Sequence, residues 1–197
     1  MDVDAFAAEL FRIGCVKFGD FTLKSGKKSP VYVDLRGLVS HPSVLRLAGE
    51  ALVGVLRGLE FDRIAGLPYA GLPLAVSASL VGDLPMLYAR KEAKDYGTRK
   101  LIEGNYEPGQ TVALLDDVIT NGGAKLELAE PFINEGLAVR DFVVLIDREQ
   151  GGAEALAEKG YRLHSVFTLR QVLDSLHRQG SIPETQYREV MDYLNAS

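Results

Sequence analysis

The sequence predicts an α/β fold in which a mainly parallel sheet is flanked by helices. Short, almost wholly apolar segments alternate with helical segments from residue 63 onward, as is typical of strands that are covered on both faces. No repeat or linker-like segment divides the 197 residues, of which 47% are hydrophobic and 25% charged. These observations predict one compact domain over residues 1–197.

The first forty residues do not follow this alternation. Phe6, Leu10 and Ile13 recur at helical spacing, and Gly14 suits the end of that helix. The segment FTLKSGKKSPVYVDLR, residues 21–36, is expected to form two extended pieces around a turn that contains Gly and Pro. We therefore expect a small N-terminal hood subdomain over about residues 1–40.

The remaining elements follow in order. A helix is expected from Pro42, because proline suits the first helical turn and an apolar stripe follows. Further helices are expected after Gly71, Gly123, Gly151 and Thr168, and a terminal surface helix, with no assigned chemistry, over residues 182–197. Pro131 should kink or displace its helix. The expected strands are residues 63–68, 85–90, 111–117, 141–147 and 162–168, which gives Rossmann-like layering.

Composition excludes several classes of function. The formal net charge of −5 argues against a nucleic-acid partner, and no apolar run approaches the roughly 18 residues that span a membrane. The N-terminus carries acids where a secretory or transit peptide is basic, so a cytoplasmic location is expected. Cys15 is the single cysteine and is expected to be a buried thiol. The three histidines lack metal-ligand spacing, and no G-x-S-x-G motif is present.

The stretch LLDDVITNGGAK, residues 114–125, carries the first site signal. In an open α/β sheet, ligands bind beyond the carboxyl ends of the strands, which selects the loops that begin at Pro68, Arg90, Asp116 and Asp147. Backbone amides in a glycine turn before a helix favour phosphate. Acids beside them suit sugar hydroxyls or a shared magnesium ion. The alternative is that Asp117 only caps the turn.

A basic segment, RKEAKDYGTRKLIEG at residues 90–104, carries the second signal. It is too polar to pack, and its cations suit a lid that neutralises a departing diphosphate. The alternative is a solvated charged loop. Residues 24–28 contain further lysines, so an acidic chain presents two basic loops that favour a small, highly charged anion.

These motifs resemble a known family. LLDDVITNGGAK resembles the phosphoribosyl diphosphate signature of the type I phosphoribosyltransferases, while R-K-x-x-K-x-[HY]-G and FTLKSGKKSPVYVD resemble the flexible loop and the base-site segment of orotate phosphoribosyltransferases. GLPYAGLPLA and LIDREQGG complete the family order. The segments LVSHPS, PMLYARKEAKDYGT and RLHSVFTL also resemble the phosphoribosyltransferase half of animal uridine monophosphate synthase.

The resemblance implies transfer of phosphoribosyl from 5-phosphoribosyl 1-diphosphate to orotate in UMP biosynthesis, giving orotidine 5'-monophosphate and diphosphate. It also implies the type I phosphoribosyltransferase fold and a homodimer whose subunits share lid residues. Mg²⁺ is expected to be held mainly through the substrate, near Asp116 and Asp117, with no direct protein ligand. No decarboxylase domain follows in this sequence, so only the transfer activity is expected.

The resemblance also assigns residues. Arg90, Lys91 and Lys94 correspond to lid cations on the diphosphate, Lys91 serving the neighbouring subunit, and with Asp116 and Asp117 they form the catalytic set. The residues matched to phosphoribosyl diphosphate are Lys24, Arg90, Lys91, Lys94, Tyr96, Asp116, Asp117, Val118, Ile119, Thr120, Asn121, Gly122, Gly123 and Ala124. Those matched to orotate are Thr120, Arg148, Tyr32 and Val33.

For three of these residues the sequence leaves alternatives open. Arg148 could form a surface ion pair with Asp147 or Glu149, Lys24 could be a solvated turn lysine, and Tyr32 could be a core aromatic.

Two positions depart from the pattern of many family members. Tyr96 stands where bacterial members carry histidine, and a phenol with a reference pKa of about 10 is a poor proton shuttle at neutral pH. Ala70 replaces a lysine that some members use against the diphosphate, which places more of that task on Arg90 and Lys94. Two other functions remain open, a purine phosphoribosyltransferase and a non-catalytic regulator that senses phosphoribosyl diphosphate.

Overall fold

The computed structural model describes residues 2–22, 26, 28–90 and 101–196. Its elements, in chain order, are α1 (Val3–Arg12), β1 (Val16–Thr22), β2 (Lys28–Val33), the 3₁₀ helix η1 (Leu35–Ser40), α2 (Pro42–Leu56), β3 (Arg63–Gly66), α3 (Gly71–Gly82), β4 (Met86–Ala89), β5 (Ile102–Glu103), β6 (Thr111–Ile119), α4 (Gly123–Asn134), β7 (Ala138–Asp147), α5 (Gly152–Ala157), β8 (Arg162–Thr168), α6 (Leu169–Arg178) and α7 (Glu184–Asn195). No helix in this described part is long and apolar enough to cross a membrane.

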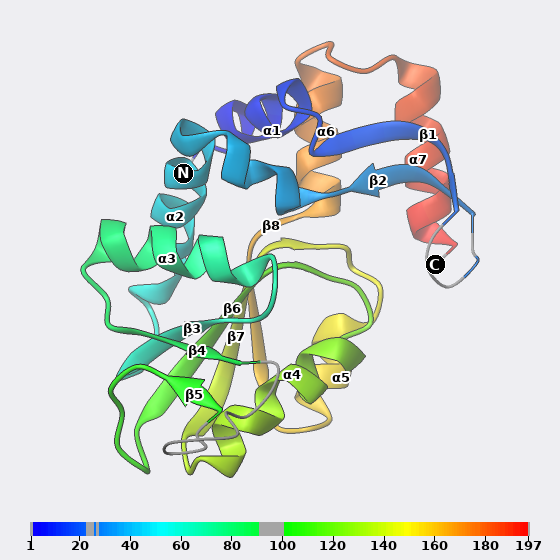
Figure 1. Cartoon of the computed structure of the whole chain (residues 1–197). Coiled ribbons are helices and arrows are strands. Elements are labelled where there is room, and N and C mark those ends of the chain that lie inside the picture. The colour runs from blue at the N-terminus through cyan, green and yellow to red at the C-terminus, as the bar shows by residue number, and fades with distance from the viewer. Residues whose placement is uncertain (1, 23–25, 27, 91–100, 197) are drawn as a thin grey trace.

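The central sheet has six strands in the order β5-β4-β3-β6-β7-β8 (Figure 1). The five expected strands all form and pair in parallel, which confirms the predicted architecture. The sixth strand, β5, runs antiparallel beside β4 at the edge and lies within the segment predicted as a lid. Its two residues are too few to show a hydrophobic period, so no sequence pattern predicts it.

Helices cover both faces of the sheet, as the apolar strands require. On one face Leu115 and Val143 belong to a core shared with α1, α2, α3, α6 and α7. On the other face Leu114 and Val144 pack against α4 and α5, chiefly on Phe132 and Leu156 (Figure 1). The alternation of neighbouring strand residues between the two cores is the period of two that β structure imposes.

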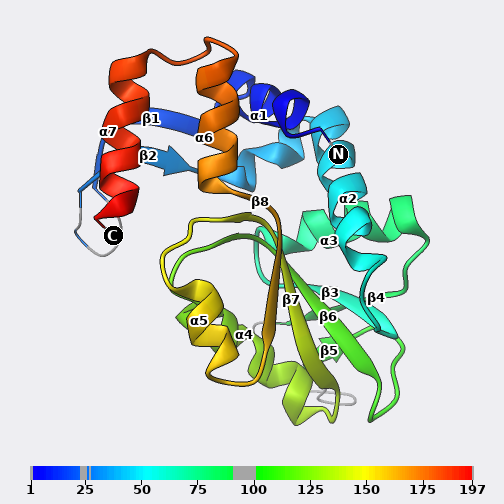
Figure 2. The ribbon, with the colours of Figure 1, turned by 180° about the vertical axis from the view of Figure 1, so that it is seen from behind.

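The hood is built from both ends of the chain. β1 and β2 form a separate antiparallel pair, and α6 and α7 pack on this layer together with α1 (Figure 2). Asp4 of α1 accepts a hydrogen bond of 2.7 Å from Ser175 and is paired with Arg178. The predicted hood of residues 1–40 therefore also includes the two C-terminal helices, whose contacts lie some 170 residues away in sequence.

Most helix boundaries agree with the expected ones. Pro42 occupies the first turn of α2, and the terminal helix forms as α7. Pro131 lies inside α4, and the helix continues through it to Asn134, so the helix is not displaced there; the expected kink stays a prediction. The missing amide of a proline near a helix C-terminus removes one hydrogen bond, and the chain still completes its last turn.

Cys15 is buried, with 1% of its surface exposed, as expected for a structural thiol. Burial, with the charge of Asp34 nearby, raises the pKa of this thiol to about 11. At pH 8 we expect iodoacetamide to modify the folded protein at least about 100-fold more slowly than the protein unfolded in urea, because the thiolate is scarce and shielded. Mass spectrometry of timed samples measures both rates; equal rates would show that Cys15 is open to solvent.

Candidate active site

The carboxyl ends of β3, β6 and β7 meet at one edge of the sheet, and the loops that follow them lie side by side beneath the hood (Figures 1 and 2). Parallel register brings Leu115 beside Gly66 and Ile119 beside Asp147. The loops that follow Gly66, Ile119 and Asp147 are therefore neighbours in space, as the strand-end rule predicts. The second of these loops begins later than expected, because β6 continues past Asp116 to Ile119.

The stretch that leads from the end of β6 into the first turn of α4 is the candidate phosphate site. We call residues 117–124 the phosphate loop, although residues 117–119 still belong to β6. Gly122 has φ of 78°, a left-handed conformation that glycine adopts without strain. In the described residues no side chain caps the N-terminus of α4; Asn121 Oδ1 lies 3.4 Å from the Gly123 amide, which is long for a hydrogen bond. An uncapped helix N-terminus favours an anion through its amides and its dipole.

The loop after β7 fixes the phosphate loop from the side. The Arg148 amide donates to the Ile119 carbonyl over 3.1 Å. A Cβ at Gly152 would lie 2.6 Å from the carbonyl oxygen of Thr120, so only glycine permits this approach. Gly152, the second glycine of LIDREQGG, therefore allows the two loops to come into contact.

The two predicted acids differ in environment. Asp116, 4% exposed, lies on the α4 side of β6; its Oδ1 accepts from the Asp117 amide over 2.8 Å, and its Oδ2 is paired with Lys125. Burial raises the pKa of Asp116 to about 7, an effect that Lys125 opposes and the charge of Asp117 increases. The predicted contact of Asp116 with a ligand stays a prediction, because both its oxygens have partners within the protein.

Asp117 is half-buried and lies on the opposite side of β6, toward the hood. Arg36 of η1 is near enough for its charge to interact with that of Asp117. Arg36 also bonds both carboxylate oxygens of Asp34 at 2.7 Å and reaches the Tyr32 hydroxyl at 3.4 Å. Tyr32 in turn stacks on Phe21, with ring centroids 5.3 Å apart. The hood thus supplies an aromatic and cationic wall that faces the acid.

Arg148 is a buried cation that has no anionic partner in the part of the chain that the structure describes. Only 6% of the Arg148 surface is exposed, and its Nε and Nη2 atoms have no hydrogen-bond partner among the described residues. Burial lowers its pKa, while a hydrogen bond with Tyr193 of α7 acts the other way. The alternative of a surface ion pair is therefore wrong; Glu149 instead lies 3.5 Å from Arg170. A buried guanidinium with free donors is suited to a planar anion such as a carboxylate.

The other predicted residues fall into three groups. Arg90 follows β4 and pairs with Glu103 over 3.2 Å. Tyr32 and Val33 are half-buried on β2, while Thr120, Asn121, Gly123 and Ala124 are exposed. The side chains of Val118 and Ile119 pack into the cores, so only their backbone can face a ligand. Four of the predicted residues lie outside the described ones: Lys24, Lys91, Lys94 and Tyr96.

Three residues at this site were not predicted from the sequence: Lys125, Arg36 and Tyr193. A lysine in the first turn of a helix opposes the helix dipole, which is a signal that could have drawn attention to Lys125. Arg36 and Tyr193 carry no comparable signal, because their roles depend on how the hood folds over the sheet. The residues that the structure describes contain no cluster of three or more His, Cys, Asp or Glu that could hold a metal ion.

Comparison with known proteins gives the family. No protein-family model matches the chain. Orotate phosphoribosyltransferase of Caenorhabditis elegans is 43% identical over 191 residues, which cover 96% of this chain and 84% of that protein. The chain belongs to the orotate phosphoribosyltransferase family.

Longer relatives of this orotate phosphoribosyltransferase family member contain the same region. Bovine uridine 5'-monophosphate synthase is 49% identical over 187 residues, or 94% of this chain and 39% of the bovine protein. The structure of Leishmania donovani UMP synthase matches with a TM-score of 0.92 and 40% identity, covering 100% of this chain and 43% of that one. The chain thus spans less than half of either synthase, and its fold is that of the type I phosphoribosyltransferases.

The unpartnered charge of Arg148 should cost stability. We expect Arg148→Met to raise Tm by about 2–4 °C, which corresponds to about 1 kcal/mol, because the variant removes a desolvated cation and keeps an apolar stem. Calorimetry of the ligand-free protein measures the shift. Arg170→Met, which removes a partly exposed and paired arginine, is the control and should change Tm little. A lower Tm for Arg148→Met would mean that the guanidinium stabilises the free protein.

Proposed function

We propose that this chain transfers the phosphoribosyl group of 5-phosphoribosyl 1-diphosphate to orotate, releasing orotidine 5'-monophosphate and diphosphate in UMP biosynthesis. One observation carries the proposal: the uncapped phosphate loop lies next to Arg148, whose guanidinium has donors without acceptors. The two are joined by the hydrogen bond from the Arg148 backbone amide to the Ile119 carbonyl. The nucleotide product carries a phosphate at one end and a carboxylate at the other, so each anion has a matching site. Family membership supports the same reaction.

Positioning and electrostatics supply the catalysis in this proposal. Positive charge develops at C1 of the ribose as the diphosphate departs, and the ring nitrogen of orotate attacks from the opposite face, so no protein nucleophile is required. The phosphate loop fixes the 5'-phosphate. Asp117, the acid that faces the hood, binds ribose hydroxyls and stabilises the developing cation.

Cations at the sheet edge stabilise the leaving diphosphate. Arg90 is the one within the described residues that the family resemblance assigns to this task, and Lys91 and Lys94 complete the predicted set. In the free protein Arg90 is paired with Glu103, and both side chains are about one third exposed, at 34% and 32%. Such a pair contributes about 0–1 kcal/mol, so a diphosphate with several negative charges replaces Glu103 at little cost.

The residues present fit a magnesium ion that is held through the substrate. Mg²⁺ in phosphate sites keeps several waters and takes one or two carboxylates besides the phosphate oxygens. Asp117 is the carboxylate available for this, since Asp116 is paired with Lys125. When bound, the ion neutralises part of the diphosphate charge. Asp117 itself holds the hydroxyl side of the ribose in place.

Orotate is the acceptor that fits the base side of the site. Its carboxylate can accept two hydrogen bonds from the free donors of Arg148. Tyr193 of α7 interacts with this guanidinium, and Tyr32, which stacks on Phe21 in the hood, is the aromatic that we propose for the base. Purines carry no carboxylate and would leave the buried cation unpaired, which is costly. A nucleic-acid-binding regulator is disfavoured by the net charge of −5.

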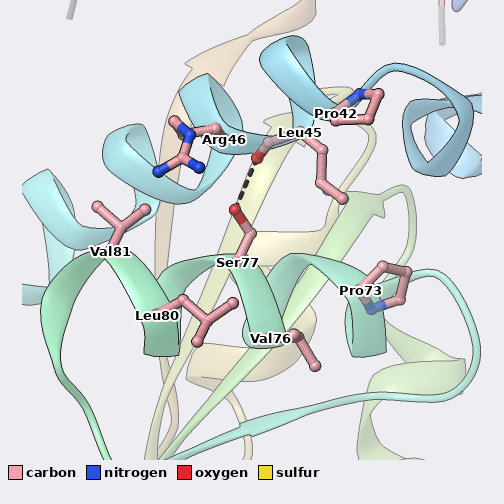
Figure 3. Close-up of a pocket in the computed structure, with 8 residues that line it drawn as sticks. All are labelled: Pro42, Leu45, Arg46, Pro73, Val76, Ser77, Leu80 and Val81. Carbon is pink, nitrogen blue, oxygen red and sulfur yellow. Dashed lines mark hydrogen bonds between the residues drawn. The ribbon is translucent and has the colours of Figure 1, made fainter.

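We further propose that two copies of the chain associate through the apolar face of α2 and α3. Here Val76 and Leu80 are exposed, Leu80 to 81%, beside a groove of ≈ 430 Å³ between the two helices (Figure 3). Ser77 donates to the Leu45 carbonyl over 2.8 Å and holds the helices together beneath this surface. Exposed apolar patches of this kind mark interaction sites, and the family resemblance implies a second copy that shares its lid.

We also propose that the protein is located in the cytoplasm, which cell fractionation would test.

The acceptor assay tests the reaction. With phosphoribosyl diphosphate and magnesium, we expect absorbance changes with orotate but not with uracil, hypoxanthine or adenine, and no reaction after chelation of the metal. Arg148→Met is the matched variant: its KM for orotate should rise on the order of 100-fold while its KM for phosphoribosyl diphosphate stays within about threefold. Consumption of a purine in place of orotate would refute the assignment.

Sedimentation tests the proposed dimer. We expect the wild-type protein to sediment at the mass of two chains and Leu80→Glu to sediment as a monomer, because a carboxylate would be desolvated at the contact. Ile133→Glu is the control, since Ile133 is 42% exposed on α4, on the other face of the sheet. Equal behaviour of the two variants would contradict the proposed surface.

A further inference from the structure

The ion pair between Asp116 and Lys125 joins the two residues that flank the phosphate loop. Asp116 is the residue before the loop and Lys125 the residue after it, and both are at least nine-tenths buried, at 4% and 9% exposure. The same Asp116 carboxylate accepts from the first amide of the loop, that of Asp117, over 2.8 Å. The pair therefore closes a ring that consists of the loop and one salt bridge.

A third loop reaches this ring. A Cβ at Gly71, where α3 begins, would lie 3.1 Å from Asp116 Oδ1 and 2.4 Å from the carbonyl oxygen of Leu115. The segment that leads from β3 into α3 is thus packed directly on Asp116. The Asp116 carboxylate therefore lies in contact with the starts of both α3 and α4.

Fold stability alone does not account for a lysine here. The first turn of a helix disfavours a cation, and a buried ion pair costs as much desolvation as it returns in attraction. A methionine of similar length would fill the same apolar space without that cost. What the ammonium adds is a fixed direction for the Asp116 carboxylate, together with a positive charge beneath the uncapped end of α4.

We propose that Lys125 is a positioning residue for phosphoribosyl diphosphate: by holding Asp116, it keeps the phosphate loop in its binding conformation before the ligand arrives. The inference rests on the proposed function for the identity of the ligand. It assigns different roles to the two adjacent acids: Asp116 holds the loop in shape through Lys125, and Asp117 faces the sugar. Preorganisation of this kind increases affinity by removing the cost of ordering the loop on binding.

Calorimetric titration with phosphoribosyl diphosphate alone tests the proposal without reference to the acceptor. We expect Lys125→Met to raise Kd at least about tenfold, and Lys125→Arg, which keeps the charge, to remain within about threefold of wild type. Lys159→Met, at an exposed lysine after α5, is the control and should bind as wild type does. An unchanged Kd for a folded Lys125→Met would overturn the proposal, even if its Tm falls.

A double-mutant cycle separates positioning from general destabilisation. If Lys125 acts through Asp116, the variant Asp116→Asn/Lys125→Met should bind no worse than the weaker of the two single variants, within about twofold. The double variant leaves neither charge of the pair buried, so its Kd can be measured even if Lys125→Met is too unstable to study. Multiplied single effects, or wild-type affinity in the double variant, would overturn the proposal. The acceptor assay is independent: tight binding of phosphoribosyl diphosphate without use of orotate would refute the proposed reaction and leave this inference standing.

Discussion

Parallel pairing of β6 with both β3 and β7 is the constraint on which the site depends. It makes three strands end at one edge, so that three loops of different sequence must share a small volume. The chain meets this demand with glycines where backbones approach, as at Gly152 against Thr120, and with charged groups where a ligand is to bind. The chemistry of the site is therefore a property of the sheet edge rather than of any single loop.

Two buried charges on this edge illustrate how differently a fold can treat an ion. Asp116 has a partner on α4 and an amide donor, so its charge is compensated in the free protein. Arg148 has a neutral partner in Tyr193 and donors without acceptors, so its charge is compensated only when an anion arrives. In the roles that we propose, the first arrangement gives the loop its shape, and the second provides affinity and selectivity for an anion while it lowers the stability of the free protein.

The sequence was sufficient for what depends on local pattern. Apolar runs predict the five strands, and the strand-end rule predicts that the loops near Asp116 and Arg148 lie together. The sequence does not predict the role of a residue whose partners lie far away in the chain. Nothing in the local sequence of Asp4 indicates that it bonds Ser175, and Tyr193 lies in a terminal helix that looked like plain surface. The cis peptide between Pro68 and Tyr69 and the short strand β5 likewise have no local sequence signal.

The joining of α1 to α6 through Asp4 gives assembly a natural order. The strands that carry the phosphate loop are complete once β7 has formed near residue 147, whereas the hood requires residues beyond 175 to meet residue 4. Contacts of such wide sequence separation form late, because closing so long a loop lowers the chain entropy before the contact contributes any stabilising energy. On the ribosome, the loops at the sheet would thus form before the hood, and a chain stalled between the two stages would expose the apolar face of α1 that packs against α6 in the finished protein.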